Sequence, residues 1–110
     1  MKVRDDKVYL LDILDSIEII EKYTAEVSLE EFEKNFMLQD AVIRRFEVIG
    51  EAATKISDAF KKGNPEVEWR LISGMRNKLI HEYLGISVIT IYNTVYKDLP
   101  VLKQKIKPFV

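Results

Sequence analysis

The residues best suited to chemistry lie between Met75 and Tyr83, in the sequence MRNKLIHEY. His81 is the single histidine among 110 residues, and an ordinary histidine, with a pKa of about 6.5, can take up and release protons near neutral pH. Arg76 keeps its charge and presents planar N–H donors that can bind a phosphate or a carboxylate. Together these two side chains could move a proton and hold an anion.

Each of these residues also has an ordinary structural interpretation. A lone histidine late in a helix is more often a structural or surface residue than a catalytic one. Arg76 lies near the middle of an apolar helical face, so it needs an anionic partner or water, and Asp40 and Glu51 are possible partners in a buried ion pair. Asn77 can be a solvated polar residue. On residue types alone, both interpretations stand.

The helix expected to carry these residues does not by itself aim Arg76 and His81 at one point. Apolar residues recur at helical spacing from Trp69 to Leu84, and His81 lies roughly 100–140° from Arg76 on a helical wheel. Either the helix ends near His81, where Gly85 would suit its C-terminus, or a second copy of the chain completes the site.

The same apolar periodicity along the rest of the chain predicts an all-α bundle. Its longest expected element is a central helix at 36–61, and the capping pattern of Ser28 and Glu31 starts a short helix before it. Asn35 could cap the central helix, and Pro65 is expected to start a new helical turn with Asn64 as its cap. The expected helices are, in order, 5–23, 29–34, 36–61, 65–84, 88–95 and 98–107.

Several other side chains receive ordinary roles. Arg45 lies at the edge of the apolar arc of the central helix and is best explained by a side chain that extends toward solvent. Trp69 and Met75 are expected in the core. Five lysine side chains are expected to be solvated: Lys61, Lys62, Lys103, Lys105 and Lys107.

Composition limits the class of protein. A chain of 110 residues, 47% of them hydrophobic, suits one domain spanning residues 1–110. It has no cysteine and one histidine, which argues against a metal centre, and no apolar run approaches the roughly 18 residues of a membrane span. We therefore expect a cytoplasmic protein without a metal or cofactor. The net charge of −1 argues against general phosphate attraction as a basis for RNA binding.

Longer stretches resemble a known family. Arg76, His81 and Tyr83 match the Arg-x4-His-x-Tyr signature of the HEPN superfamily, and the flanking sequence is similar to its HepT-like toxin family. The similar stretches are DAVIRRFEVIGEAATKI at 40–56, EWRLISGMRNKLIHEY at 68–83 and KDLPVLKQKI at 97–106.

This resemblance implies a HEPN-like up-and-down bundle that forms a homodimer. It also implies a metal-independent endoribonuclease toxin of a type VII-like toxin–antitoxin pair, with RNA as substrate and transfer RNA as the favoured candidate. Arg76 and His81 would be catalytic: Arg76 would hold the phosphate while His81 moves a proton at the ribose 2′-hydroxyl or the leaving 5′-oxygen. Asn77 would support the site at the two-fold interface.

The resemblance further implies a protein partner. In HepT-like toxins a nucleotidyltransferase antitoxin transfers AMP to the tyrosine that corresponds to Tyr83, which blocks the site. Two alternatives remain open. The chain could be a non-catalytic partner or substrate of a nucleotidyltransferase, or a purely structural dimer in which Arg76 is paired internally.

Overall fold

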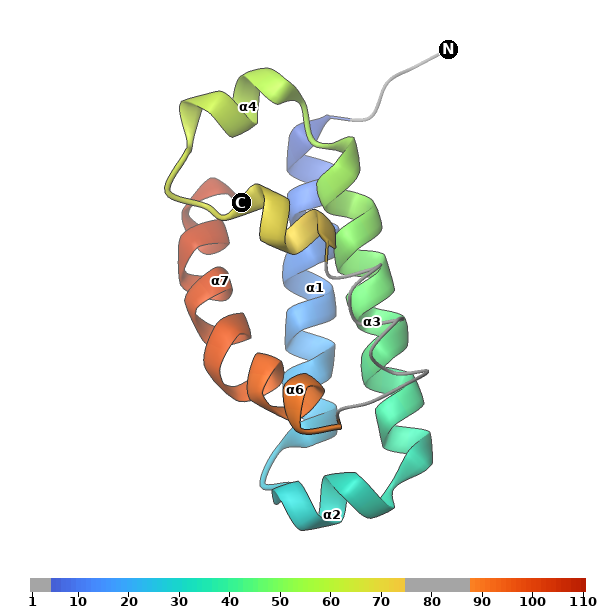
Figure 1. Ribbon diagram of the computed structural model, residues 1–110. Helices are drawn as coiled ribbons and strands as arrows, with labels where there is room; N and C mark the ends of the chain where they lie inside the picture. Colours follow the sequence, from blue (N-terminus) through green and yellow to red (C-terminus); the bar gives the residue numbers. More distant parts are fainter. Residues whose placement is uncertain (1–4, 75–87) are drawn as a thin grey trace.

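The computed structural model describes residues 5–74 and 88–110, and every regular element in these two stretches is helical (Figure 1). The prediction of an all-α fold is confirmed. Besides a helical stretch at residues 69–74, the elements are α1 (Asp6–Thr24), α2 (Leu29–Lys34), α3 (Phe36–Lys55), α4 (Asp58–Gly63), α6 (Val88–Asn93), the π-helical η1 (Thr94–Asp98), α7 (Leu99–Ile106) and the 3-10 helix η2 (Lys107–Phe109).

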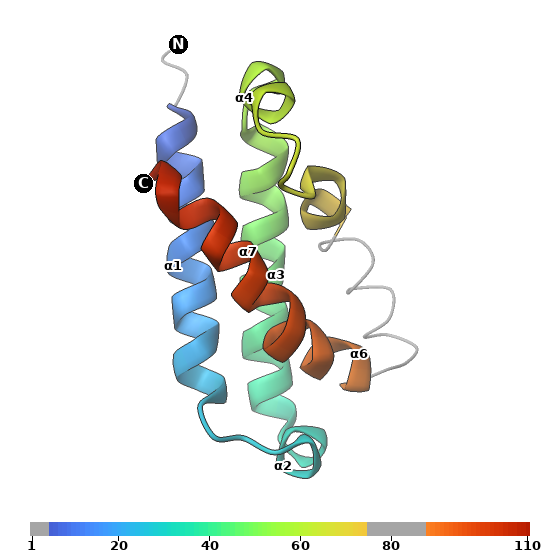
Figure 2. The same cartoon turned by 90° about the vertical axis from the view of Figure 1, so that its left-hand side faces the viewer.

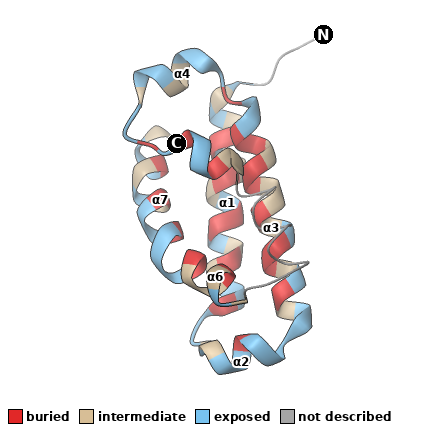
Figure 3. Cartoon of the chain, in the orientation of Figure 1, coloured by how far each residue is buried: buried red, intermediate tan, exposed pale blue. Residues whose placement is uncertain are grey.

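The long helices α1 and α3 form an antiparallel pair, with α2 across one end and α4 at the other (Figure 1). The chain from α6 to α7 returns diagonally across this pair, as Figure 2 shows. Burial follows the inner faces of the long helices (Figure 3). The core is rich in isoleucine on α1 and is completed by α3 and α7, with the fully buried residues Ile13, Ile17, Ile20, Phe46, Ile49 and Ile106.

The predicted capping box starts α2 as expected. Ser28 Oγ accepts a hydrogen bond from the Glu31 backbone N–H at 3.1 Å, and the Glu31 carboxylate accepts one from the Ser28 N–H at 3.2 Å. Asn35 then caps α3, because its side-chain oxygen accepts from the Leu38 N–H at 3.0 Å. These local patterns fix the sharp turn between α2 and α3.

The prediction of one helix over 36–61 is wrong beyond Lys55. Ile56 is extended, with φ −69° and ψ 139°, and Ser57 starts α4 by accepting a hydrogen bond from the Phe60 N–H at 3.2 Å. Ser57 also donates its N–H and its hydroxyl to the Asp6 carboxylate at 2.8 and 2.6 Å. A serine cap and a distant carboxylate thus end the helix although the apolar pattern continues.

The predicted helical start at Pro65 is also wrong. Residues 65–67 form a turn, in which the Val67 N–H donates to the Asn64 carbonyl at 3.3 Å and Val67 is buried. Asn64 ends α4 instead of starting the next helix, and its amide donates to the Phe60 carbonyl at 3.0 Å. The helix begins at residue 69.

The two helices expected at 88–95 and 98–107 are one continuous helical path with a π turn inside it. Leu99 donates its N–H to the Thr94 carbonyl, one residue further back than in an α-helix. Pro100 explains the change, because proline lacks an N–H and its ring clashes with the carbonyl four residues earlier in an α-helix. α7 ends at Ile106, before Pro108 as expected.

Candidate active site

The predicted site residues Arg76, Asn77, His81 and Tyr83 all lie in residues 75–87, outside the described residues, as does Met75. We call this stretch the candidate segment. The structure describes the chain on both sides of it, at residues 69–74 and at α6. Both of these flanking helices lie on the same side of the α1–α3 pair (Figure 1 and Figure 2). The roles of the four residues remain predictions.

Aromatic packing anchors the helix that leads into the candidate segment. Trp69 is buried, which confirms its predicted place in the core, and its indole N–H donates to the Asn64 carbonyl at 3.0 Å. Its ring meets Phe60 edge-on at 5.9 Å, and Phe60 meets Phe109 at 5.1 Å. Ile72 is buried one turn later. The entrance to the candidate segment is therefore fixed against α4 and the C-terminus.

A second group of contacts anchors α6, which follows the candidate segment. Ile91 is fully buried, and the Tyr92 ring lies 5.8 Å from the Phe32 ring of α2. The Tyr92 hydroxyl donates to the Val27 carbonyl at 3.1 Å. The sequence predicts only that Tyr92 lies in the helix expected at 88–95. The available signal was the second tyrosine, Tyr96, four positions later on the same helix.

The two carboxylates considered as partners of Arg76 both lie on α3. Asp40 is exposed, and Glu51 is partly exposed with its carboxylate 3.5 Å from Lys55 Nζ. Arg45 is half-buried, as expected for a side chain that extends along an apolar surface toward water. An ion pair of Arg76 with Asp40 or Glu51 stays a prediction.

A shallow groove of about 320 Å³ runs between α1 and α3. Its charges are mixed, since Arg44 lies 3.5 Å from Glu47 and Lys55 lies 3.5 Å from Glu51. Each of these two cations faces a glutamate of its own helix, so the groove offers no concentrated positive charge for a nucleic-acid backbone. It is lined by Tyr9, Asp12, Arg44, Glu47, Val48, Glu51, Ala52 and Lys55.

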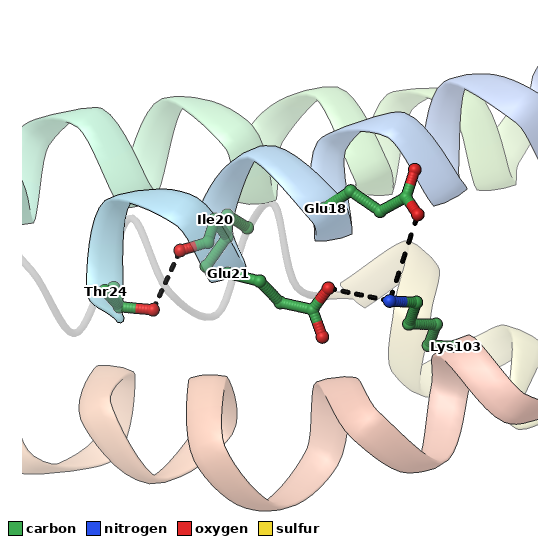
Figure 4. Close-up of polar contacts among 5 residues, drawn as sticks. All are labelled: Glu18, Ile20, Glu21, Thr24 and Lys103. Atoms are coloured by element: carbon green, nitrogen blue, oxygen red, sulfur yellow. Dashed lines mark hydrogen bonds and ion pairs between the residues drawn. The ribbon is translucent and has the colours of Figure 1, made fainter. Parts of the chain in front are cut away.

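Lys103 is not simply solvated, which corrects its predicted role. Its ammonium lies 2.8 Å from the Glu21 carboxylate and 3.9 Å from that of Glu18, so it joins α7 to α1 (Figure 4). The hydrogen bond that Lys103 donates to the Glu21 carboxylate raises the pKa of Lys103 above its ordinary value. Desolvation opposes this rise, and the negative charges of Glu21 and Glu18 add to it.

The described residues contain no candidate metal centre. Among residues 5–74 and 88–110, no group of three or more His, Cys, Asp or Glu side chains could hold a metal ion. Within the same residues, no helix is long and apolar enough to cross a membrane.

Comparison with known proteins gives one consistent result. A family model described as "Ribonuclease HepT-like" matches residues 13–109. A Thermococcus cleftensis protein named "Probable ribonuclease HepT" is 46% identical, with 93% of each chain covered. A Methanocaldococcus jannaschii protein named "Putative RNase MJ1380" is 39% identical, over 97% of this chain and 98% of its own length. No solved structure shows a significant match.

Proposed function

Because the chain belongs to the HepT-like ribonuclease family, we propose that it is a metal-independent endoribonuclease that acts as the toxin of a toxin–antitoxin pair. The observation that carries this proposal is the family match over residues 13–109, which includes the whole candidate segment. Relatives named as ribonucleases align with nearly the full chain, so the likeness is not confined to a short motif. The protein acts as one helical domain in the cytoplasm.

Arg76 and His81 carry the reaction in this proposal. Cleavage of RNA without a metal needs a group that moves protons near neutral pH and a cation that stabilises the charge growing on the phosphate. His81 supplies the first by taking the proton of the ribose 2′-hydroxyl or by protonating the leaving 5′-oxygen. Arg76 supplies the second through its guanidinium. The 2′-oxygen then bonds to phosphorus as the bond to the 5′-oxygen breaks, which leaves a 2′,3′-cyclic phosphate and a 5′-hydroxyl.

A homodimer completes the site. Arg76 and His81 point in different directions on one straight helix, whereas a second copy can bring its His81 toward Arg76. Asn77, next to Arg76 in the sequence, would hold the two candidate segments together across the two-fold axis with its paired donor and acceptor. RNA is the substrate, with transfer RNA as the favoured class.

Tyr83 is the control point of the proposed toxin. A nucleotidyltransferase antitoxin transfers AMP to its hydroxyl, which forms a phosphodiester to the ring oxygen and releases diphosphate from ATP. The added phosphate is anionic and bulky, so it competes with RNA phosphate for Arg76. The same residue is then part of the site and the means of blocking it.

The proposal is tested by inducing the wild type, Arg76→Ala and His81→Ala in separate cultures, then mapping RNA ends in each. Lys78→Ala is the matched control, because it removes a neighbouring cation to which no role is assigned. We expect growth arrest and 2′,3′-cyclic phosphate ends with the wild type and the control alone. Loss of the proton carrier should reduce cleavage by about 10²–10⁴-fold.

The same experiment separates the enzyme from the alternative of a non-catalytic partner. If all four proteins are soluble and every culture grows alike with intact RNA, the endoribonuclease toxin is ruled out. Binding of a nucleotidyltransferase would then remain as the role of the chain. Unchanged cleavage by purified His81→Ala would instead remove His81 from the mechanism and leave the enzyme in place.

A further inference from the structure

Two tyrosine hydroxyls from the helix after the candidate segment converge on the turn between α1 and α2. Tyr92 donates to the Val27 carbonyl at 3.1 Å, and Tyr96 contacts both the Thr24 and the Val27 carbonyls, the latter at 3.0 Å. A phenol has one hydrogen to donate, so Tyr96 shares it between the two acceptors. We call Tyr92 and Tyr96 the tyrosine pair.

The turn that receives these hydroxyls is conformationally demanding. Glu26 has a φ of 58°, in the left-handed region that is unfavourable for a residue other than glycine. Thr24 ends α1 by donating its hydroxyl to the Ile20 carbonyl at 2.8 Å (Figure 4), and the Val27 N–H returns to the Thr24 carbonyl at 3.2 Å. The tyrosine pair satisfies the carbonyls on both sides of Glu26 and so helps to hold this turn.

The rings of the pair form a column that also fixes their rotation. The centroids of Tyr92 and Tyr96 are 4.5 Å apart, and Tyr92 lies 5.8 Å from the fully buried Phe32. Tyr96 belongs to the π turn caused by Pro100, and this extra residue changes the direction of side chains along the helix relative to an α-helix. The four-residue spacing of the two tyrosines puts their rings on the same face of the helical path.

We infer that the tyrosine pair is a positioning element for the candidate segment, an inference that rests on the proposed function for its catalytic consequence. α6 begins shortly after Tyr83 in the chain. Contacts that hold α6 in place therefore also hold the point where the candidate segment, which carries the residues proposed to react, joins α6. Residues 69–74 anchor the other attachment through Trp69. The tyrosine hydroxyls act through α6 and touch no substrate.

The test is the double variant Tyr92→Phe/Tyr96→Phe, which keeps both rings and removes both hydroxyls. Tyr23→Phe is the matched control, because Tyr23 is 45% exposed on α1 and its hydroxyl has no partner in residues 5–74 and 88–110. Hydrogen exchange is followed by mass spectrometry on peptides from 75–93, from α1 and from α3. RNA cleavage is measured in parallel as kcat and KM.

We expect exchange at 75–93 to rise about tenfold in the double variant, with α1 and α3 much less affected. kcat should fall about tenfold with little change in KM, because the reacting groups lose their alignment while RNA still binds. The control should match the wild type in each measurement.

Two results would overturn the inference. The first is unchanged exchange at 75–93 in the double variant. The second is a uniform rise across α1, α3 and 75–93, which would make the pair an ordinary contributor to global stability. If the wild type cleaves no RNA, the proposed function fails on its own, while the exchange pattern still decides whether the pair positions this part of the chain.

Discussion

Asp6 and Ser57 are joined by two short hydrogen bonds although they lie 51 positions apart in the sequence. One carboxylate oxygen accepts the Ser57 backbone N–H and the other accepts its hydroxyl. Asp6 is in the first turn of α1, and Ser57 is the cap of α4. This contact holds the start of the first helix to the point where the chain leaves α3, at the end of the bundle opposite α2.

Replacing Asp6 with alanine should lower the free energy of unfolding by about 1–2 kcal/mol, because two hydrogen bonds to a charged acceptor are lost at an exposed site. Urea unfolding followed by circular dichroism measures the change. Asp15→Ala is the control, since it removes the same charge from an exposed position of α1 and should change stability by less than about 0.5 kcal/mol. Equal effects of the two variants would show that the contact with Ser57 contributes nothing.

Replacing Trp69 with phenylalanine should cost about 1–3 kcal/mol, because the indole N–H that donates to the Asn64 carbonyl is lost and the smaller ring leaves space beside Phe60. The same unfolding experiment measures this loss. Phe36→Leu alters an aromatic residue that is 72% exposed, and it should be nearly neutral. A neutral Trp69→Phe would mean that this anchor of the candidate segment is weak.

The contact of Lys103 with Glu21 should make stability depend on alkaline pH. The folded-state pKa of Lys103 is raised, so its stabilising effect is fully present below the ordinary lysine pKa of about 10.4 and is lost as pH rises through the folded-state value. Lys103→Met should therefore lower the urea midpoint at about pH 8 and differ less from the wild type at about pH 11.5. Lys107→Met, at an exposed position, serves as the control. A difference that persists at high pH would indicate lost packing in place of lost charge.

Replacing Tyr83 with phenylalanine should leave the toxicity intact and prevent its neutralisation by the nucleotidyltransferase. Phenylalanine lacks the oxygen that would receive AMP, so the variant should stay toxic when a cognate nucleotidyltransferase is produced with it. The wild type should gain the mass of an AMP group and lose cleavage activity under the same conditions. Tyr23→Phe should behave as the wild type. If the nucleotidyltransferase neutralises Tyr83→Phe as well, modification of this tyrosine is not the means of control.

Local sequence patterns predicted the parts of the fold that depend on near neighbours. Ser28 and Glu31 form a capping box within one helical turn, so the bounds of α2 could be read directly from the sequence. Asn35 is a similar case, since its acceptor meets the N–H of Leu38. The apolar spacing on α1 likewise predicted a helix whose ends differ by one residue from the structure.

The errors arose where a distant residue or a single proline decides the outcome. Apolar spacing continues through Ile56, but Ser57 finds Asp6 across the bundle, and no local pattern reports that contact. Lys103 likewise meets Glu21 on another helix. The sequence predicts a separate helix at 98–107, whereas the helical path runs without a break through a π turn at Thr94–Asp98 into α7, which contains Pro100. For the candidate site, the family resemblance was confirmed by comparison, while the roles of Arg76 and His81 depend on geometry that helical spacing alone does not supply.

The π turn at Thr94–Asp98 also determines how the buried face of α6 is rotated about the helix axis relative to the buried face of α7. Each residue added to a helix rotates everything beyond it by about 100°, so the extra residue lets α6 and α7 bury side chains on faces that a uniform helix would not align. Deleting one residue from this turn would barely shorten the protein. Because a π turn is wider than an α-helical turn and takes up one more residue, a deletion that returned it to α-helical hydrogen bonding would keep the buried faces of α6 and α7 aligned.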